Sequence, residues 1–527
     1  MIYDLLAGSW TYRSFINRPG LLPDLDPEHI VKDDVATWSR YLFGQGVMTF
    51  HPTLTGALTG LFEMGTDEQP LDMHLNGKIE DRDGVTWVKW NAHGLPNTPS
   101  DGWLYEYDAY YTAKWPNGRG QTEAIVGSVV RSVPHDDLAP NQTVDRSAQQ
   151  GSVASFIMVR PAFVEARDVI PLPPELLEML GSRAHRLHHA IWHGLRDNWV
   201  NPIDGDISDA DKVEITNLGW APPHPNQRPT RGTVEKRDPD NGAGEDFLYM
   251  HRQMIHQVRE LLSGHGLPMI EAWTSIPSPN RQSRNRDGFS VPPTWNPGDE
   301  NDARGLATVK SDEYWQSRMT FLERQFKNPE YLATLSLDQL GAKIEWLIHN
   351  LMHIRWCSLP TEPGEALTPV PGGRPASDTS DKWIKATRKN KPFYYDNLND
   401  TFSSHVHPVF WRLHGWVDDR IEDWYAAHDA AHPGEVIRDT VGGISWFAKG
   451  PWVSVETPWV GPAMAGHAQG GHAGDHEHEG HGHPEYDVTV MQRVYDLIFK
   501  PPEAADVTAS GTPVVRSVQF TRKIFRE

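Results

Sequence analysis

The sequence predicts a multidomain α+β protein in which an N-terminal antiparallel β-barrel precedes an α-helical bundle. Two observations lead to this prediction. From residue 1 to about residue 160, apolar and polar residues alternate in short runs that Gly, Pro, Asn and Asp interrupt, as in successive β-strands. From about residue 171, apolar residues recur instead at helical spacing. We therefore expect a barrel domain at 1–165, a helical domain at 166–462, and a His-rich loop with a C-terminal segment at 463–527.

The composition narrows the class of protein. At 527 residues the chain is long enough for two or three domains. Its net charge of −21, without a basic run to offset it, argues against a nucleic-acid partner. No apolar stretch approaches the ~20 residues of a membrane span, so we expect no membrane partner. The sequence does not begin with a basic region followed by an apolar core, so we expect no secretory signal and a cytoplasmic protein. The single cysteine, Cys357, excludes internal disulfides and zinc ribbons built from several thiolates.

The N-terminal part holds many short strand-like segments in succession, which indicates an antiparallel barrel or sandwich. Its opening residues, Gly8 to Ser14, resemble the GxW start of calycin-type barrels such as lipocalins. Such a barrel could hold a ligand or serve as a structural module, and the sequence leaves both readings open.

The helical part begins at residues 173–199, where Pro173 and Pro174 occupy positions that favour a helix start. A loop rich in Pro, Asn and Gly follows at 202–244. Helical spacing then resumes in four further segments, which are 245–262, 313–326, 336–357 and 410–428. Four of the five helical segments carry histidines, as a metal site inside a helix bundle requires.

Two histidines one turn apart, His349 and His353, share one face of a predicted helix and could clamp a metal ion. His414, on a later helix, supplies a third imidazole. Neutral imidazole suits copper well, and three such ligands per ion leave a position open for oxygen. Because two electrons must reach O2 together, we expect a second set of three histidines.

These residues resemble a known family. His349 to His353 read HNLMH, and residues 408–418 read PVFWRLHGWVD, which is similar to the second copper-binding region of type 3 copper proteins, the tyrosinases, catechol oxidases and hemocyanins. The resemblance implies that His349, His353 and His414 bind one copper. His407 stands where the family usually has Asp, and Leu413 replaces the first histidine of a usual pair.

The other copper is matched by the phrase FLYMHRQMIHQVRELL, in which the resemblance implies that His251 is a ligand. The remaining two ligands should lie upstream, one helical turn apart, which leaves His189 with His193 or His185 with His189. We prefer His189 and His193, because the residues between them are apolar. His224 remains a further candidate.

The resemblance implies two copper ions, molecular oxygen and a phenol, either a small molecule or peptide-bound. The enzyme would hydroxylate the phenol to a catechol and oxidise it to the o-quinone, in natural-product or siderophore maturation. Alternatives are a catechol oxidase, an oxygen-binding hemocyanin-like protein and a three-histidine zinc hydrolase. A homodimer is possible.

A phenol hydroxyl has a pKa of about 10 and must lose its proton before it binds copper. The resemblance implies that Asn350 and a nearby Glu hold a water that takes this proton, and Glu345 lies one turn before His349. Alternatively, Glu345 only orients a ligand imidazole.

The resemblance also implies that the tail is a lid, with Tyr486 or Tyr495 in the site. Removing the chain after about Met464 would then raise activity on a small phenol. We interpret the six histidines of 467–483 as a linker rather than a copper-capture segment.

Overall fold

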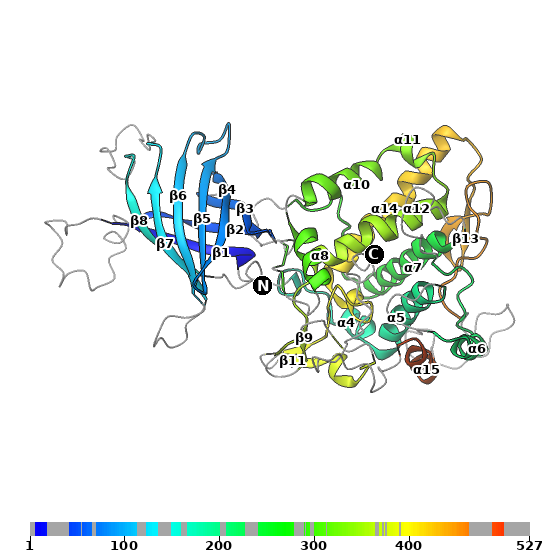
Figure 1. The fold of residues 1–527 in the computed structure, drawn as a ribbon. Coiled ribbons are helices and arrows are strands. Elements are labelled where there is room, and N and C mark those ends of the chain that lie inside the picture. The colour runs from blue at the N-terminus through cyan, green and yellow to red at the C-terminus, as the bar shows by residue number, and fades with distance from the viewer. Residues whose placement is uncertain are drawn as a thin grey trace. The chain divides into compact units, whose positions relative to one another are not determined.

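The chain divides into two compact units, Met1–Val164 with Pro279–Arg286, and Glu165–Ser278 with Asp287–Glu527. Figure 1 shows a barrel of strands in the first unit and mainly helices in the second. The computed structural model describes residues 6–17, 42–53, 55–65, 70–112, 123–134, 149–159, 166–200, 207–226, 241–278, 289, 291–292, 294–295, 300–311, 314–363, 368–370, 374, 377–388, 391–462 and 487–499.

The first unit is a closed barrel of eight strands in sequential order, each antiparallel to its neighbours. Its last strand pairs back on its first, with Thr11 opposite Val159, so the sheet has no free edge. The predicted antiparallel barrel is therefore confirmed. The strands are β1 (Gly8–Ile16), β2 (Leu42–Pro52), β3 (Ala57–Gly65), β4 (Pro70–Arg82), β5 (Val85–Gly94), β6 (Leu104–Thr112), β7 (Ala124–Arg131) and β8 (Val153–Val159).

Alternation along the strands fills the barrel with aromatic rings. Trp90 and Tyr107 stack inside it, with ring centroids 4.8 Å apart, and Tyr12 and Phe156 contact the same group. Gly77 lies opposite Trp90, and a Cβ at Gly77 would come within 2.6 Å of the Trp90 Cβ, so only glycine fits there. The interior is thus a packed aromatic core.

The second unit is built mainly of helices, as predicted. They are α3 (Ala166–Val169), α4 (Pro174–Leu180), α5 (Arg183–Asn198), α6 (Asp209–Asn217), α7 (Ala243–Gly264), α8 (Glu300–Lys310), α10 (Thr320–Gln325), α11 (Pro329–Leu332), α12 (Leu337–Lys343), α13 (Asn350–Trp356), α14 (Pro408–Ala431) and α15 (Val488–Ile498), with π-helical turns η4 (Trp315–Met319) and η5 (Ile344–His349) and 3-10 turns η6 (Asp381–Trp383) and η7 (Ser404–Val406). Three two-stranded sheets complete it, pairing β9 (Thr361–Glu362) with β10 (Thr368–Pro369), β11 (Ala386–Arg388) with β12 (Lys391–Phe393), and β13 (Arg438–Val441) with β14 (Ile444–Phe447).

The N-terminus of α7 is fixed against α12. Gly244 and Gly341 meet at the crossing, where a Cβ on either would lie 2.0 Å from a backbone oxygen of the other helix. The Asp338 carboxylate accepts hydrogen bonds from the amides of Gly242 and Gly244, at 3.1 and 2.7 Å, and so satisfies donors that a helix start leaves open. This contact fixes the first turn of α7, two turns ahead of His251.

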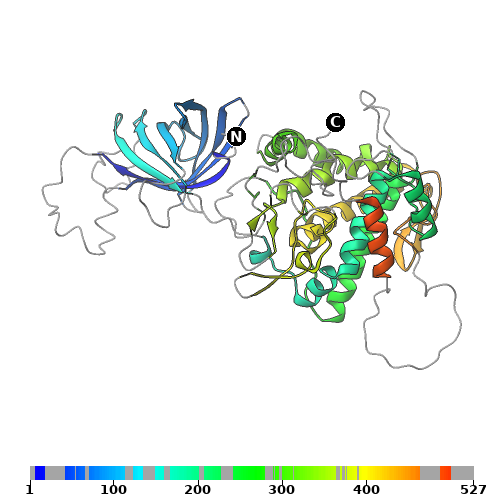
Figure 2. The same ribbon diagram turned by 60° about the horizontal axis from the view of Figure 1, so that its bottom comes forward.

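The helix α15 packs along α5 and shares a hydrophobic core with it (Figure 2, where α15 is red). Leu187, Ile191 and Leu195 of α5 meet Val494 and Ile498 of α15 in this core. Among the helices in the described ranges, none has both the length and the apolar character that crossing a bilayer requires.

Candidate metal centre

Four helical segments bring six buried histidines together. The ligand candidates are His189 and His193 on α5, His251 on α7, His349 and His353 on η5 and α13, and His414 on α14. They form two adjoining groups with ring nitrogens within 4.8 Å of one another: His189, His193 and His251, and His251, His349 and His414. His353 adjoins the second group through His349. The structure therefore brings together every histidine that the sequence predicted as a ligand.

In the second group, three ring nitrogens converge. The Nε2 atom of His349 lies 3.0 Å from Nε2 of His414 and 3.0 Å from Nε2 of His353. His353 and His414 donate their Nδ1 protons to the carbonyl oxygens of Leu398 and Phe410, both at 2.8 Å, so their Nε2 atoms carry lone pairs. Nε2 of His349 can donate one proton at most, so it cannot form a hydrogen bond to both neighbouring Nε2 atoms. In at least one of the two 3.0 Å contacts, two nitrogen lone pairs therefore face each other and repel. A cation among these nitrogens removes that repulsion.

The first group has the same arrangement of protons. Nδ1 of His189 lies 2.6 Å from the carbonyl oxygen of Thr401, and Nδ1 of His251 lies 2.8 Å from that of Phe247. A buried neighbour, His405, donates from Nε2 to the Leu180 carbonyl at 3.0 Å and turns its Nδ1 toward Nδ1 of His189, 3.1 Å away. His189 is thereby held with its proton on Nδ1 and its Nε2 lone pair available to a metal ion.

Burial favours the neutral form of one ring in each group. It lowers the pKa of His189 and His414 well below the ordinary histidine value, and neighbouring histidines lower both further. Metal ions bind the neutral imidazole, so no proton has to leave before an ion binds near pH 7. A set of neutral imidazoles without carboxylates fits copper, and it also fits zinc.

One buried segment orients a ligand of each group. In residues 397–406, here called the carbonyl loop, the Leu398 carbonyl accepts from His353 and the Thr401 carbonyl accepts from His189. By contrast, His251 and His414 each bond to a carbonyl four residues earlier on their own helix. The rings of His189 and His353 therefore depend on a separate piece of chain for their orientation.

An ion pair joins α5 to η5 beside the histidines. Arg196 donates from both terminal nitrogens to the two Glu345 oxygens, at 2.9 and 3.0 Å, and both side chains are buried. Arg196 also donates to the Ala243 carbonyl at 2.6 Å and to Asn226 at 3.2 Å, and it lies over the Trp192 ring. Both Glu345 oxygens are thus already engaged by a permanent cation.

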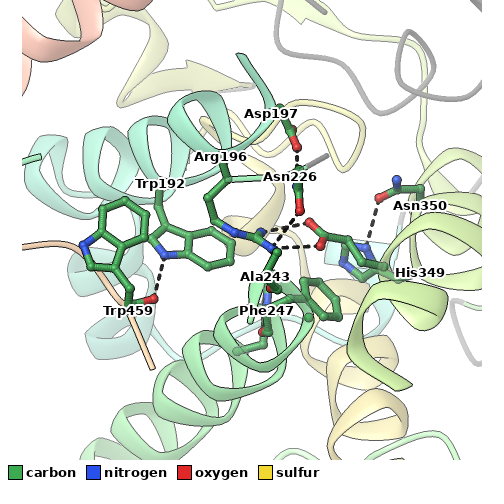
Figure 3. Close-up of polar contacts among 12 residues, drawn as sticks. Trp192, Arg196, Asp197, Asn226, Ala243, Phe247, His349, Asn350 and Trp459 are labelled. Atoms are coloured by element: carbon green, nitrogen blue, oxygen red, sulfur yellow. Dashed lines mark hydrogen bonds and ion pairs between the residues drawn. The ribbon is translucent and has the colours of Figure 1, made fainter. Parts of the chain in front are cut away.

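Asn350 contacts a ligand directly. Its Oδ1 lies 3.0 Å from Nδ1 of His349 (Figure 3), while its buried Nδ2 has no hydrogen-bond partner in the part of the chain that the structure describes. Asn350 therefore orients His349 and keeps an N–H donor that could bind a further group. Its expected role in taking the phenol proton stays a prediction.

The alternative ligands lie elsewhere. His185 is partly exposed, and its ring centroid lies 5.0 Å from that of His405. His224 is partly exposed, and its Nδ1 lies 3.0 Å from Oδ2 of Asp246. This hydrogen bond raises the pKa of His224. Neither belongs to a histidine group. The structure thus places His189 and His193, rather than His185 or His224, beside His251, and their role as metal ligands stays a prediction.

The two departures from the family pattern have structural explanations. His407 precedes α14, and its Nδ1 accepts a hydrogen bond from the Val409 amide at 3.2 Å, a capping role that Asp also fills. Leu413 is fully buried in the hydrophobic core. Neither change removes a group from the two histidine sets.

The sequence did not point to Arg196, His405 or the carbonyl loop. Arg196 follows His193 by three residues and so shares its helix face, which was a usable signal. The loop carried none, because it acts through backbone carbonyls that every residue has.

The tail tyrosines divide between the described and undescribed parts of the chain. Tyr495 is buried in the core between α15 and α5, where its hydroxyl accepts a hydrogen bond from Arg374 at 2.9 Å, so it does not lie at the histidines. Tyr486 and the histidine-rich residues 467–483 lie outside the described residues.

Comparison with protein-family models gives no match, and comparison with curated proteins gives none either.

Proposed function

We propose that this protein is a type 3 copper enzyme that oxidises phenols, with one ion held by His189, His193 and His251 and another by His349, His353 and His414. The observation that supports it best is the convergence of ring nitrogens whose protons are turned outward to carbonyl oxygens. Two copper ions held in this way would supply paired one-electron reduction of O2, the chemistry that phenol hydroxylation and catechol oxidation require.

The chain's own contribution is to hold the rings. The carbonyl loop and the helix backbones fix four ligand tautomers, and Asn350 orients His349. Phe410 stacks on His414, with centroids 3.7 Å apart, and Phe247 lies against His251 and His349. These apolar rings exclude water from the site and strengthen the electrostatic interactions inside it.

A second candidate, a catechol oxidase without phenol hydroxylation, is favoured by the position of Glu345. Both oxygens of its carboxylate already accept hydrogen bonds from Arg196, so neither faces a phenol or a water without a partner. Asn350 remains the one predicted member of the base with a donor left to hold a water. The substrate class, whether small or peptide-bound, and the role of the barrel remain proposals.

Metal analysis and two substrates test the proposal. We expect two copper ions per chain after loading with copper, and turnover of a small catechol with O2. Turnover of a small phenol as well would identify a tyrosinase. His349→Ala should abolish both activities, because each ion needs its full set of ligands to act with the other.

His256→Ala is the matched control for this experiment, because His256 lies on α7 but is partly exposed and pairs with Glu260. It should keep both copper ions and full activity. One zinc ion per chain, no copper, and hydrolysis instead of oxidation would replace our proposal with a zinc hydrolase.

A further inference from the structure

The helix α15 lies directly behind the ligands of α5. Gly194 follows the ligand His193, and a Cβ built on Gly194 would lie 2.6 Å from Cζ of Phe499, just after α15. At the middle of α15, Arg493 makes two hydrogen bonds to Glu214 of α6, at 2.6 and 2.9 Å. The helix is therefore held by close packing and by charge.

A buried polar connection runs from α15 to the carbonyl loop. The Tyr495 hydroxyl accepts from Arg374 at 2.9 Å, and Nε of Arg374 lies 3.4 Å from Oδ2 of Asp400. Arg374 also lies over the Phe402 ring, 4.0 Å from its centroid. Both Arg374 and Asp400 are fully buried, so this charge pair is not screened by water.

Asp400 in turn shapes the loop. Its Oδ1 accepts from the Phe402 amide at 3.0 Å, and its backbone oxygen accepts from the amides of Ser403 and Ser404, at 2.9 and 2.8 Å. Thr401, the residue between Asp400 and Phe402, presents the carbonyl that holds His189. Anything that moves Asp400 therefore moves the acceptor on which the His189 ring depends.

We infer that Tyr495 is a positioning residue of the metal centre, acting through Arg374 and Asp400 on the carbonyl loop that orients His189 and His353. The tail helix then serves as a support of the site. This inference rests on the proposed function only for the identity of the ions, since the hydrogen bonds it concerns exist without them. It replaces the expectation that Tyr495 occupies the site from a lid.

Tyr495→Phe removes the hydroxyl and keeps the ring in the core. The first measurement is the NMR signal of the histidine Nδ1 protons in the metal-free, ¹⁵N-histidine-labelled full chain. We expect the Nδ1 proton signals of His189 and His353 to shift, and these protons to exchange faster with water. The signals of His251 and His414 should stay unchanged, because only His189 and His353 bond to the carbonyl loop. A general loss of stability would not separate the pairs in this way.

The second measurement is copper(I) affinity by competition with a chelator. Loss of a group that supports ligand orientation typically weakens metal binding at least about tenfold, and we expect that loss here. Tyr105→Phe is the matched control, since Tyr105 in the barrel also accepts from a buried arginine, Arg131, at 3.2 Å. It should leave the affinity and all four proton signals unchanged.

Arg374→Lys provides a second variant, which keeps the positive charge but cannot reach Tyr495 and Asp400 together. It should shift the same two signals. Unchanged His189 and His353 signals in both variants would overturn the inference. A wild-type chain that binds no copper, with the two signals still shifting in the variants, would overturn the proposed function and leave the positioning role of Tyr495 intact.

Discussion

At the scale of single residues, Arg196 and Glu345 connect the helix of one histidine group to that of the other. A buried pair adds little stability over an apolar replacement, but removing one partner leaves an uncompensated charge. Glu345→Gln should therefore lower the free energy of unfolding by about 3–5 kcal/mol, measured by denaturant titration. The ion pair joins α5 to η5, so its loss should let these two elements move relative to each other. Under the proposed function, copper content and both oxidase activities should then fall in parallel.

Asn350→Ala is the contrasting variant. If Asn350 helps to take the phenol proton, the variant should lose phenol hydroxylation far more than catechol oxidation. Because Asn350 also orients His349, a weaker copper affinity should lower both activities to the same extent, so the assay is done at saturating copper and the ratio of the two activities is compared. Should Glu345→Gln instead retain copper and lose only phenol hydroxylation, Glu345 would be part of the base after all.

His407 makes the stability of the protein depend on pH. Burial, together with Arg167 and His353, lowers its pKa well below the ordinary value. As pH falls below about 6.5, the unfolded chain takes up a proton that the folded protein excludes, so His407 contributes stability above that pH which is lost on acidification. Protonation would also end its acceptance of the Val409 amide proton.

Asn keeps the cap without titrating, so His407→Asn should flatten this dependence. In metal-stripped protein we expect the slope of unfolding free energy against pH to decrease by up to about 1.4 kcal/mol per pH unit once the pH is about one unit below 6.5. Urea titrations at several pH values measure it. An unaltered slope in His407→Asn would show that His407 is not a source of it.

At the scale of elements, the contact between α5 and α15 has no spare room. Gly194→Ala should cost about 1–3 kcal/mol through overpacking against Phe499, which outweighs the ~1 kcal/mol by which alanine favours a helix. Thermal unfolding compares the variants. Gly264→Ala on α7 is the control, since a Cβ there meets nothing within 4 Å, and it should be neutral or stabilising.

Shortening the partner should relieve this overpacking. Adding Phe499→Leu to Gly194→Ala should recover part of the loss, so the two changes together should cost less than their sum. Simple additivity would mean that the two residues do not oppose each other across this contact.

At the scale of the whole molecule, the predictable features were those that repeat along the chain. Alternation indicated the barrel, because one face of every strand is buried. One-turn spacing indicated His349 with His353, and one-turn spacing together with apolar residues between the histidines favoured His189 with His193. The unpredicted features depend on contacts between distant segments. The Arg374 side chain meets Asp400 and Tyr495 only after folding, and the Thr401 carbonyl has no side-chain signature.

The position of α15 also has a consequence for timing. In the part of the chain that the structure describes, α15 follows every other element, yet it backs α5, whose histidines are the first ligands to be synthesised. Contacts between segments so far apart in sequence form late, since the intervening chain must be ordered first. A growing chain thus reaches its full set of supported histidines only when α15 has left the ribosome and docked, and under the proposed function copper would bind the complete set after synthesis.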